Sequence, residues 1–183
     1  YIHIPYCKQK CTYCDFHFSI NMKNMSQMIE CLYLEIEERK HYLNGKTVET
    51  IYFGGGTPSL LESEKIKYLL EKVYSTYQVS QEAEITLELN PDDITERKIT
   101  ALKDIGINRL SIGVQSFHDR DLEFMNRSHN STQAINAVNL AYNAGIKNIT
   151  IDLIYGIPGQ SMSQWEKNLN QLSTLKITHF SAY

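Results

Sequence analysis

Short apolar runs alternate with longer stretches of helical periodicity along the whole chain. The longer stretches carry apolar residues every three or four positions, as helices that pack on a core require. Such residues are Ile66, Leu69, Leu70, Val73 and Tyr77, then Ile135, Val138 and Tyr142, then Trp165, Leu169 and Leu172. The short runs predict β-strands over Tyr1–Ile4, Thr50–Phe53, Ala83–Leu89, Arg109–Val114, Asn148–Tyr155 and His179–Ala182.

Regular succession of strand and helix predicts an α/β fold with parallel strands and right-handed crossovers. Six strands and five helices are predicted, fewer than the eight of a complete TIM-like barrel, so we expect a partial, open barrel. Gly106 and Gly145 are expected to end helices, and Ser163 with Glu166 to form a capping box.

The chain shows no linker of Pro, Gly and Ser residues and no repeat, so residues 1–183 are expected to form one domain. The first residue is Tyr1, and the last residues form an apolar run without a closing helix. We therefore expect this domain to be a fragment of a longer chain, with a C-terminal part absent.

Three predicted strands place a polar side chain near their C-terminal ends. Glu88, Gln115 and Asp152 each follow the two-residue alternation that sets them on the face opposite the apolar residues. In barrels the C-terminal ends of the strands form the mouth where active sites are built. Three polar residues in matching positions therefore indicate a site, while a structural hydrogen-bonding role is the alternative for each.

Glycine runs follow two of the strands. Gly54, Gly55 and Gly56 precede Thr57, and a second run follows Tyr155. Backbone without side chains can approach a ligand closely, although a plain strand-to-helix turn is the alternative. Arg127 is either a solvated charge or a contact for a carboxylate.

Composition excludes several classes of partner. The chain of 183 residues has 18 basic and 21 acidic residues and a net charge of −3, which gives no electrostatic case for nucleic acid or an anionic membrane. No run approaches the ~20 apolar residues of a transmembrane segment. Thiols kept reduced for metal binding favour a cytoplasmic location.

The most informative motif is C-x-x-x-C-x-x-C at Cys7, Cys11 and Cys14. A four-iron cluster normally takes four thiolates, so three leave one iron open to another ligand. Zinc is an alternative if His3 or His17 supplied a fourth ligand, and unligated thiols are another. A disulfide framework fits poorly, because the chain has only four cysteines and the fourth, Cys31, stands alone.

Five motifs occur in order along the whole chain. They are Tyr1-Ile-His-Ile-Pro with the three cysteines, Gly54-Gly-Gly-Thr-Pro58, Glu88-Leu-Asn-Pro91, Asn108-Arg-Leu-Ser-Ile-Gly-Val-Gln-Ser-Phe117 and Ile151-Asp-Leu-Ile-Tyr-Gly-Ile-Pro158. Together they resemble the oxygen-independent coproporphyrinogen III oxidase family, which includes a heme chaperone branch and belongs to the radical S-adenosylmethionine (radical SAM) enzymes.

The resemblance implies a 4Fe-4S cluster on the three cysteines and SAM on its open iron, cleaved after reduction by a flavodoxin- or ferredoxin-type donor. It implies that Tyr1, Gly55 and Glu88 contact this SAM. Further residues match positions around a second SAM in the oxidase, or shape the single SAM pocket. These residues are Tyr13, Gly56, Thr57, Gln115, Arg127 and Asp152.

One position separates the branches of the family. The oxidases place a further cysteine two residues after the third ligand, where this chain has Phe16. The aromatic residue favours the heme chaperone, which would bind heme and pass it to an acceptor protein. The alternatives are the oxidase, which converts propionates of coproporphyrinogen III to vinyl groups, and a non-catalytic module stabilised by zinc. His17 is expected to be a surface histidine rather than a heme contact.

Overall fold

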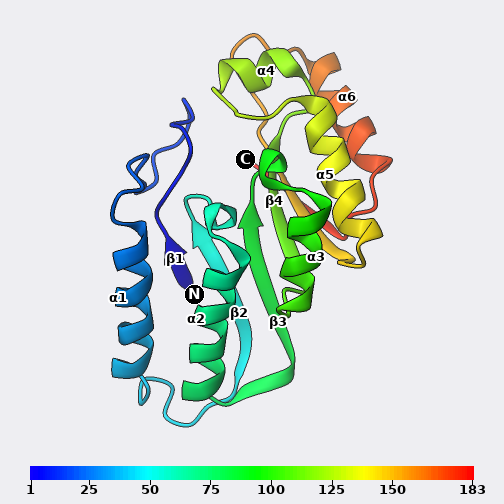
Figure 1. Cartoon of the computed structure of the whole chain (residues 1–183). Coiled ribbons are helices and arrows are strands. Elements are labelled where there is room, and N and C mark those ends of the chain that lie inside the picture. The colour runs from blue at the N-terminus through cyan, green and yellow to red at the C-terminus, as the bar shows by residue number, and fades with distance from the viewer.

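The computed structural model describes residues 1–183, and its six strands form one parallel sheet. The strands lie side by side in the order in which they occur in the chain (Figure 1). They are β1 (Ile2–Ile4), β2 (Val48–Gly55), β3 (Val79–Leu89), β4 (Arg109–Gln115), β5 (Asn148–Leu153) and β6 (His179–Ala182).

Helices connect consecutive strands. They are α1 (Met25–Glu38), α2 (Ser63–Thr76), α3 (Glu96–Asp104), α4 (Asp119–Phe124), α5 (Ser131–Asn143) and α6 (Met162–Ser173), with short 3-10 turns η1 (Pro58–Leu60) and η2 (Pro91–Asp93). Neighbouring helices pack in chain order, α1 on α2, α2 on α3 and α3 on α5. None of the helices is both long and apolar enough to span a membrane.

The sequential strand order explains the curved shape of the sheet. When every crossover has the same hand and leads to the next strand, the helices stay on one face and the sheet curls around the other. The predicted α/β open barrel of six parallel strands is therefore confirmed. Because the strands are parallel, the loops that follow them lie together at the C-terminal ends of the strands (Figure 1). The loop after β1, which carries the three cysteines, is one of them.

The main core lies between the sheet and the helices. The apolar phase of each central strand is buried there, as with Ile85, Leu87 and Leu89 of β3. Burying such side chains contributes roughly 1.5–3 kcal/mol each and drives the helices onto this face. The opposite phase carries polar residues, including Thr86 and Thr150, which are buried on the concave side. The two-residue alternation in the sequence thus separates core from concave face.

The helix ends were predicted with mixed success. Gly106 and Gly145 follow α3 and α5 with φ of +100° and +99°, as expected of residues that end helices. The capping box predicted at Ser163 is wrong, because α6 begins at Met162 and Ser161 is its N-cap. Gln164 accepts the Ser161 N–H (2.7 Å), so glutamine closes the box.

Two further predictions about elements are wrong. Tyr77 follows α2 instead of lying in it, and six α-helices are present instead of five. The additional helix is α4, whose six residues are too few for helical periodicity to be recognised in the sequence.

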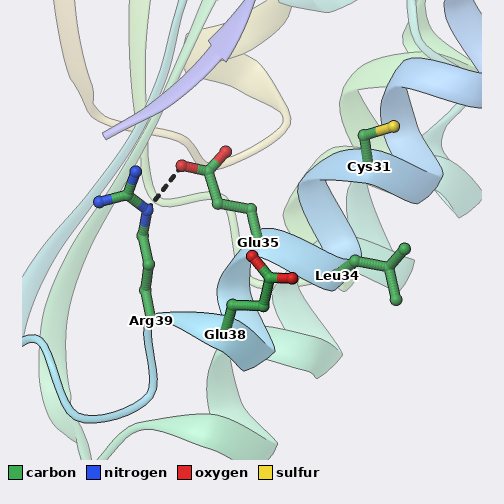
Figure 2. A pocket seen from close by; sticks show the side chains of 5 residues that line it. All are labelled: Cys31, Leu34, Glu35, Glu38 and Arg39. Carbon is green, nitrogen blue, oxygen red and sulfur yellow. Dashed lines mark hydrogen bonds and ion pairs between the residues drawn. The ribbon is translucent and has the colours of Figure 1, made fainter.

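The fourth cysteine lies apart from the other three. Cys31 is exposed on the outer surface of α1, beside Leu34 and the ion pair between Glu35 and Arg39 (Figure 2). The side chains around it come from α1 and from Arg39, the residue that follows this helix, and no second element contributes to the lining (Figure 2). This surface therefore offers no enclosed site.

Candidate cofactor site

A cavity of about 490 Å³ lies at the C-terminal edge of the sheet. Its walls come from the loop after β1, the end of β2, the ends of β3, β4 and β5, and the segment after α4. All but one of the site residues proposed from the sequence line this cavity. They are Cys7, Cys11, Tyr13, Cys14, Gly55, Gly56, Thr57, Glu88, Gln115, Arg127 and Asp152.

The three cysteines are free and partly buried. The two ends of the loop that carries them are joined, because the Cys7 N–H donates to the Ser19 carbonyl (3.0 Å). Within the loop, the Cys14 N–H donates to the Cys11 carbonyl (3.2 Å). The Thr57 hydroxyl lies 3.6 Å from Cys7 Sγ, while burial raises the pKa of this thiol. The sulfurs thus face one cavity from a loop held at both ends.

Gly56 is where the end of β2 meets the cysteine loop. A Cβ at this position would lie 2.6 Å from the Tyr6 carbonyl oxygen and 3.0 Å from Cys7 Sγ. The Gly56 N–H also donates to the Ile4 carbonyl (2.9 Å). Only a residue without a side chain permits this close approach, which brings the first cysteine against the sheet.

Glu88 is held at the end of β3 by two donors. The Tyr52 hydroxyl donates to one carboxylate oxygen (2.7 Å) and the Gly55 N–H to the other (3.0 Å). Burial raises the pKa of Glu88, an effect that these two hydrogen bonds oppose and nearby Asp152 reinforces. A cation in the cavity would restore the charged form.

Tyr1 is the proposed site residue that does not line the cavity. Its ring stacks on Tyr52, with 6.0 Å between centroids, and its hydroxyl bonds to His3 Nδ1 (3.0 Å). Tyr1 therefore lies behind the tyrosine that holds Glu88, with 74% of its surface exposed.

Gln115 ends β4 in an unusual backbone conformation. Its φ is +68°, a left-handed value that residues with a side chain seldom adopt, and the pairing with β5 shifts between Ile112 and Gln115. Such strain persists only where the surroundings impose it. The bend turns a buried amide into the cavity wall.

Asp152 approaches the cavity from β5. Burial raises the pKa of its carboxyl, and a hydrogen bond from Ser181 on β6 opposes this shift. Glu88, Gln115 and Asp152 thus line one cavity from three strands, as the sequence predicted.

The segment after α4 holds the middle of the cysteine loop. The Thr12 N–H donates to the Met125 carbonyl (3.1 Å), Gln9 Nε2 donates to the Asn126 carbonyl (2.7 Å), and Asn126 Nδ2 donates to the Lys10 carbonyl (2.7 Å). These bonds join residues more than a hundred positions apart. The position of the cysteines is therefore set by tertiary structure.

Charged side chains hold the same loop from another direction. Lys8, next to the first cysteine, forms ion pairs with Asp92 (2.7 Å) and Asp93 in η2. Asp92 also accepts a hydrogen bond from Ser128 (2.8 Å). Despite partial burial, these donors hold the pKa of Asp92 below its usual value.

His129 is buried outside the cavity lining and donates from Nε2 to the Val114 carbonyl, 3.0 Å away, while its Nδ1 has no partner. Burial, with the charge of Arg127, lowers the pKa of His129 to about 4. The imidazole is therefore neutral at physiological pH and acts as a structural group.

Sequence analysis missed several residues of the site. Asn90 accepts from Arg127 (2.7 Å), Tyr52 donates to Glu88, and Ser111 and Gly113 line the cavity from β4. Ser111 and Gly113 lie on the same face of β4 as Gln115, so the two-residue alternation that indicated Gln115 could also have indicated them. Tyr52 was not recognisable, because a tyrosine in an apolar strand has the same pattern as a core residue.

The residues present fit a multi-iron cluster better than a single zinc ion. No group of three or more His, Cys, Asp or Glu side chains lies close enough to hold one metal ion. His3 packs against Gly55 and bonds to Tyr1, and His17 is exposed and outside the cavity lining. Three thiols face the cavity without a fourth protein ligand.

The cavity lies at the C-terminal ends of the strands of an open parallel barrel, where such folds build their sites. The chain belongs to the radical SAM superfamily, whose family model matches residues 1–172. Membership implies a 4Fe-4S cluster and SAM as cofactors.

Curated relatives match the full length of this chain. It is 35% identical to the protein named heme chaperone HemW of Haemophilus influenzae and 37% identical to that of Escherichia coli K12, with 100% of this chain and 49% of each relative covered. A mitochondrial radical S-adenosyl methionine domain-containing protein 1 of Danio rerio is 35% identical, with 41% of its length covered. The chain thus spans about half the length of the curated relatives it matches.

Solved structures show the same fold. The coproporphyrinogen III oxidase HemN of Escherichia coli superposes with a TM-score of 0.89 at 29% identity over 98% of this chain and 43% of that one. Elp3 of Methanocaldococcus infernus superposes with a TM-score of 0.68 at 20% identity over 87% of this chain and 43% of that one, which is a likeness of fold alone.

Proposed function

We propose that this chain is the core of a radical SAM heme chaperone. The observation that carries the proposal is Phe16, which takes the place of the further cysteine of the oxidases and lies in the lining of the cavity with 76% of its surface exposed. The curated relatives named heme chaperone support this proposal.

We assign the cofactor contacts to residues that line the cavity. Cys7, Cys11 and Cys14 would hold the 4Fe-4S cluster, which when reduced supplies the electron that cleaves SAM. Glu88 would accept hydrogen bonds from the SAM amine, because it is a half-buried carboxylate in the cavity wall with no cation of its own. The backbone of Gly55 and Gly56 leaves room for the ligand beside it, and Tyr1 supports Glu88 through Tyr52.

The remaining proposed contacts complete the pocket wall. Tyr13, Thr57, Gln115 and Asp152 line the same cavity and would shape a single SAM pocket. Arg127 belongs to this wall as well. A second SAM remains an alternative for these positions.

Heme would be the cargo of the protein. Phe16 and Phe18 give the cavity an aromatic wall beside the cysteine loop, and flat apolar rings pack well on such side chains. A flavodoxin- or ferredoxin-type electron donor, a heme-acceptor protein, a cytoplasmic location and a single domain over residues 1–183 stay predictions from the sequence.

The second candidate function is oxygen-independent coproporphyrinogen III oxidase. The superposition on HemN, at a TM-score of 0.89, favours it. In this case the same cavity would admit a porphyrinogen propionate next to SAM.

Anaerobic reconstitution tests the cluster assignment. We expect about four irons per chain in the wild-type protein, with a reduced-cluster EPR signal, and loss of both in Cys7→Ala, Cys11→Ala or Cys14→Ala. Cys31→Ala is the matched control, because this cysteine is exposed on α1 and should leave the iron content unchanged. Iron retained by all three cysteine variants would contradict the assignment.

Two assays on the reconstituted protein separate the candidate functions. For a chaperone we expect stoichiometric heme binding, followed spectroscopically, and no decarboxylation of coproporphyrinogen III. Vinyl formation at many turnovers per chain would refute the chaperone and support the oxidase. Absence of heme binding and of vinyl formation would refute both.

A further inference from the structure

Arg127 is fixed from one side by the barrel. Its Nη2 donates to Asn90 Oδ1 (2.7 Å) and to the carbonyl of Gly113 in β4 (2.8 Å). Both acceptors belong to the cavity wall. Two acceptors, one after β3 and one in β4, therefore fix the orientation of the planar guanidinium, whose donors lie in a rigid fork.

The other side of the guanidinium faces the cysteine loop. Its Nη1 lies 3.4 Å from Cys11 Sγ and 3.2 Å from the Tyr13 hydroxyl oxygen. All four Nη hydrogens thus have acceptors within the protein, and the Nε–H is the buried donor without a partner. This arrangement directs Arg127 at a cysteine sulfur instead of leaving its fork free for a cofactor carboxylate.

No carboxylate lies within ion-pair distance of this guanidinium. The ion pairs of the protein join other residues, and Arg127 is in none of them. When Cys11 holds iron it is a thiolate, and a donor with a full positive charge then makes a charge-assisted hydrogen bond to it. The Thr57 hydroxyl, 3.6 Å from Cys7 Sγ, is a weaker counterpart because it is neutral.

We propose that Arg127 raises the reduction potential of the cluster by donating a hydrogen bond to Cys11 Sγ. The reduced cluster carries one more negative charge than the oxidised cluster, so a positive donor at a ligand sulfur stabilises it more. Arg127 is then a positioning residue that makes the cluster easier to reduce. This proposal rests on the cluster assignment and is independent of whether heme or a porphyrinogen is the substrate.

Redox titration of the reconstituted holoprotein, followed by EPR without SAM, tests the proposal. We expect Arg127→Met to load four irons and to lower the reduced-to-oxidised ratio at a fixed potential about tenfold, which is about 59 mV for a one-electron couple. Arg127→Lys keeps the positive charge but loses the forked guanidinium. The reduction potential of its cluster should therefore lie between those of the wild-type protein and Arg127→Met. An unchanged potential in Arg127→Met would overturn the proposal.

Arg109→Met is the control for loss of a positive charge elsewhere in the barrel. Arg109 pairs with Glu84 (3.7 Å) and bonds to Thr86, with no sulfur contact. We expect a clearly smaller shift than in Arg127→Met. An equal shift would overturn the role of the hydrogen bond, as would a wild-type potential in Arg127→Lys.

A measurement on the wild-type protein covers the case in which Arg127→Met fails to load iron. Holoprotein labelled with 15N-arginine should show a weak 15N coupling to the reduced cluster by pulsed EPR, because Nη1 contacts a ligand sulfur. The coupling should be absent from Arg127→Lys. Its absence from the wild-type protein would overturn the proposal, whereas failure of the heme assays would leave it standing.

Discussion

Glu88 is a half-buried acid without a cation as partner. Burial raises its pKa, and the donors Tyr52 and Gly55 compensate only in part. In the free protein this residue therefore favours folding below its ordinary pKa of 4.5, and that contribution is lost as the pH rises through the raised value. A bound ammonium group would reverse the shift, because it stabilises the ionised form.

We predict that SAM affinity increases as the pH rises through the pKa of Glu88, because the amine binds the ionised carboxylate. Glu88→Gln should weaken binding about 10- to 150-fold at neutral pH, as expected from ~1.5–3 kcal/mol for a hydrogen bond to a charged group, and should lose this pH dependence. Equilibrium dialysis with the reconstituted protein measures both effects.

Glu84→Gln is the matched control for this prediction. Glu84 lies in the same strand but pairs with Arg109, and its side chain is 42% exposed outside the cavity lining. It should bind SAM as the wild-type protein does. Equal affinity of Glu88→Gln and wild-type protein would contradict the assigned role.

The chemistry of the site was readable from residue types, while their mutual contacts were not. The spacing of the cysteines and the alternation around Glu88 and Asp152 depend on local sequence alone. The contact of Arg127 with Cys11 joins positions 116 residues apart, and no local pattern encodes it. Arg127 could therefore be predicted from the sequence as a candidate site residue, but its contact with Cys11 could not.

At the scale of elements, strands were predicted more reliably than helix starts. The strands alternate buried apolar with polar residues over short runs rich in β-branched residues, and such runs differ clearly from the turns around them. The start of α6 depends instead on one side-chain bond, and two serines two residues apart, Ser161 and Ser163, both fit the pattern of an N-cap. The structure selects Ser161.

We predict that Ser161→Ala lowers the free energy of unfolding by about 1 kcal/mol, the typical cost of losing an N-cap side chain. The reason is that the Gln164 N–H loses its acceptor, which lies 3.2 Å away. Ser163→Ala should change stability little, because this residue is exposed in the first turn of α6. Urea denaturation of the apoprotein compares the two, and equal losses would place the N-cap elsewhere.

At the scale of the whole molecule, the cysteine loop belongs to two distant parts of the chain. It follows β1, but its middle is held by the residues after α4. Asn126 is central to this contact, since its side chain bonds to the Lys10 carbonyl (2.7 Å) from a left-handed backbone with φ of +54°.

We predict that Asn126→Gly loosens the loop without a large change in global stability. Glycine accepts the left-handed backbone at lower cost, which offsets the loss of ~0.5–1.5 kcal/mol for one hydrogen bond. Hydrogen exchange of the apoprotein should show faster exchange over residues 7–14. Asn44→Gly, at another left-handed position with φ of +49°, should leave these residues unchanged. Unaltered exchange in Asn126→Gly would show that the loop is held by its other contacts.

The bonds between residues 9–12 and the segment after α4 also determine the order of assembly during synthesis. The three thiols leave the ribosome before Arg127, which follows Cys11 by 116 residues; at a usual elongation rate this separation takes roughly 6 to 23 s. During that interval the cysteine loop lacks its contacts with the segment after α4, because this segment has not yet been made. We therefore expect iron insertion to follow the translation of β4 and α4, since only then are the residues made that fix the cysteine loop.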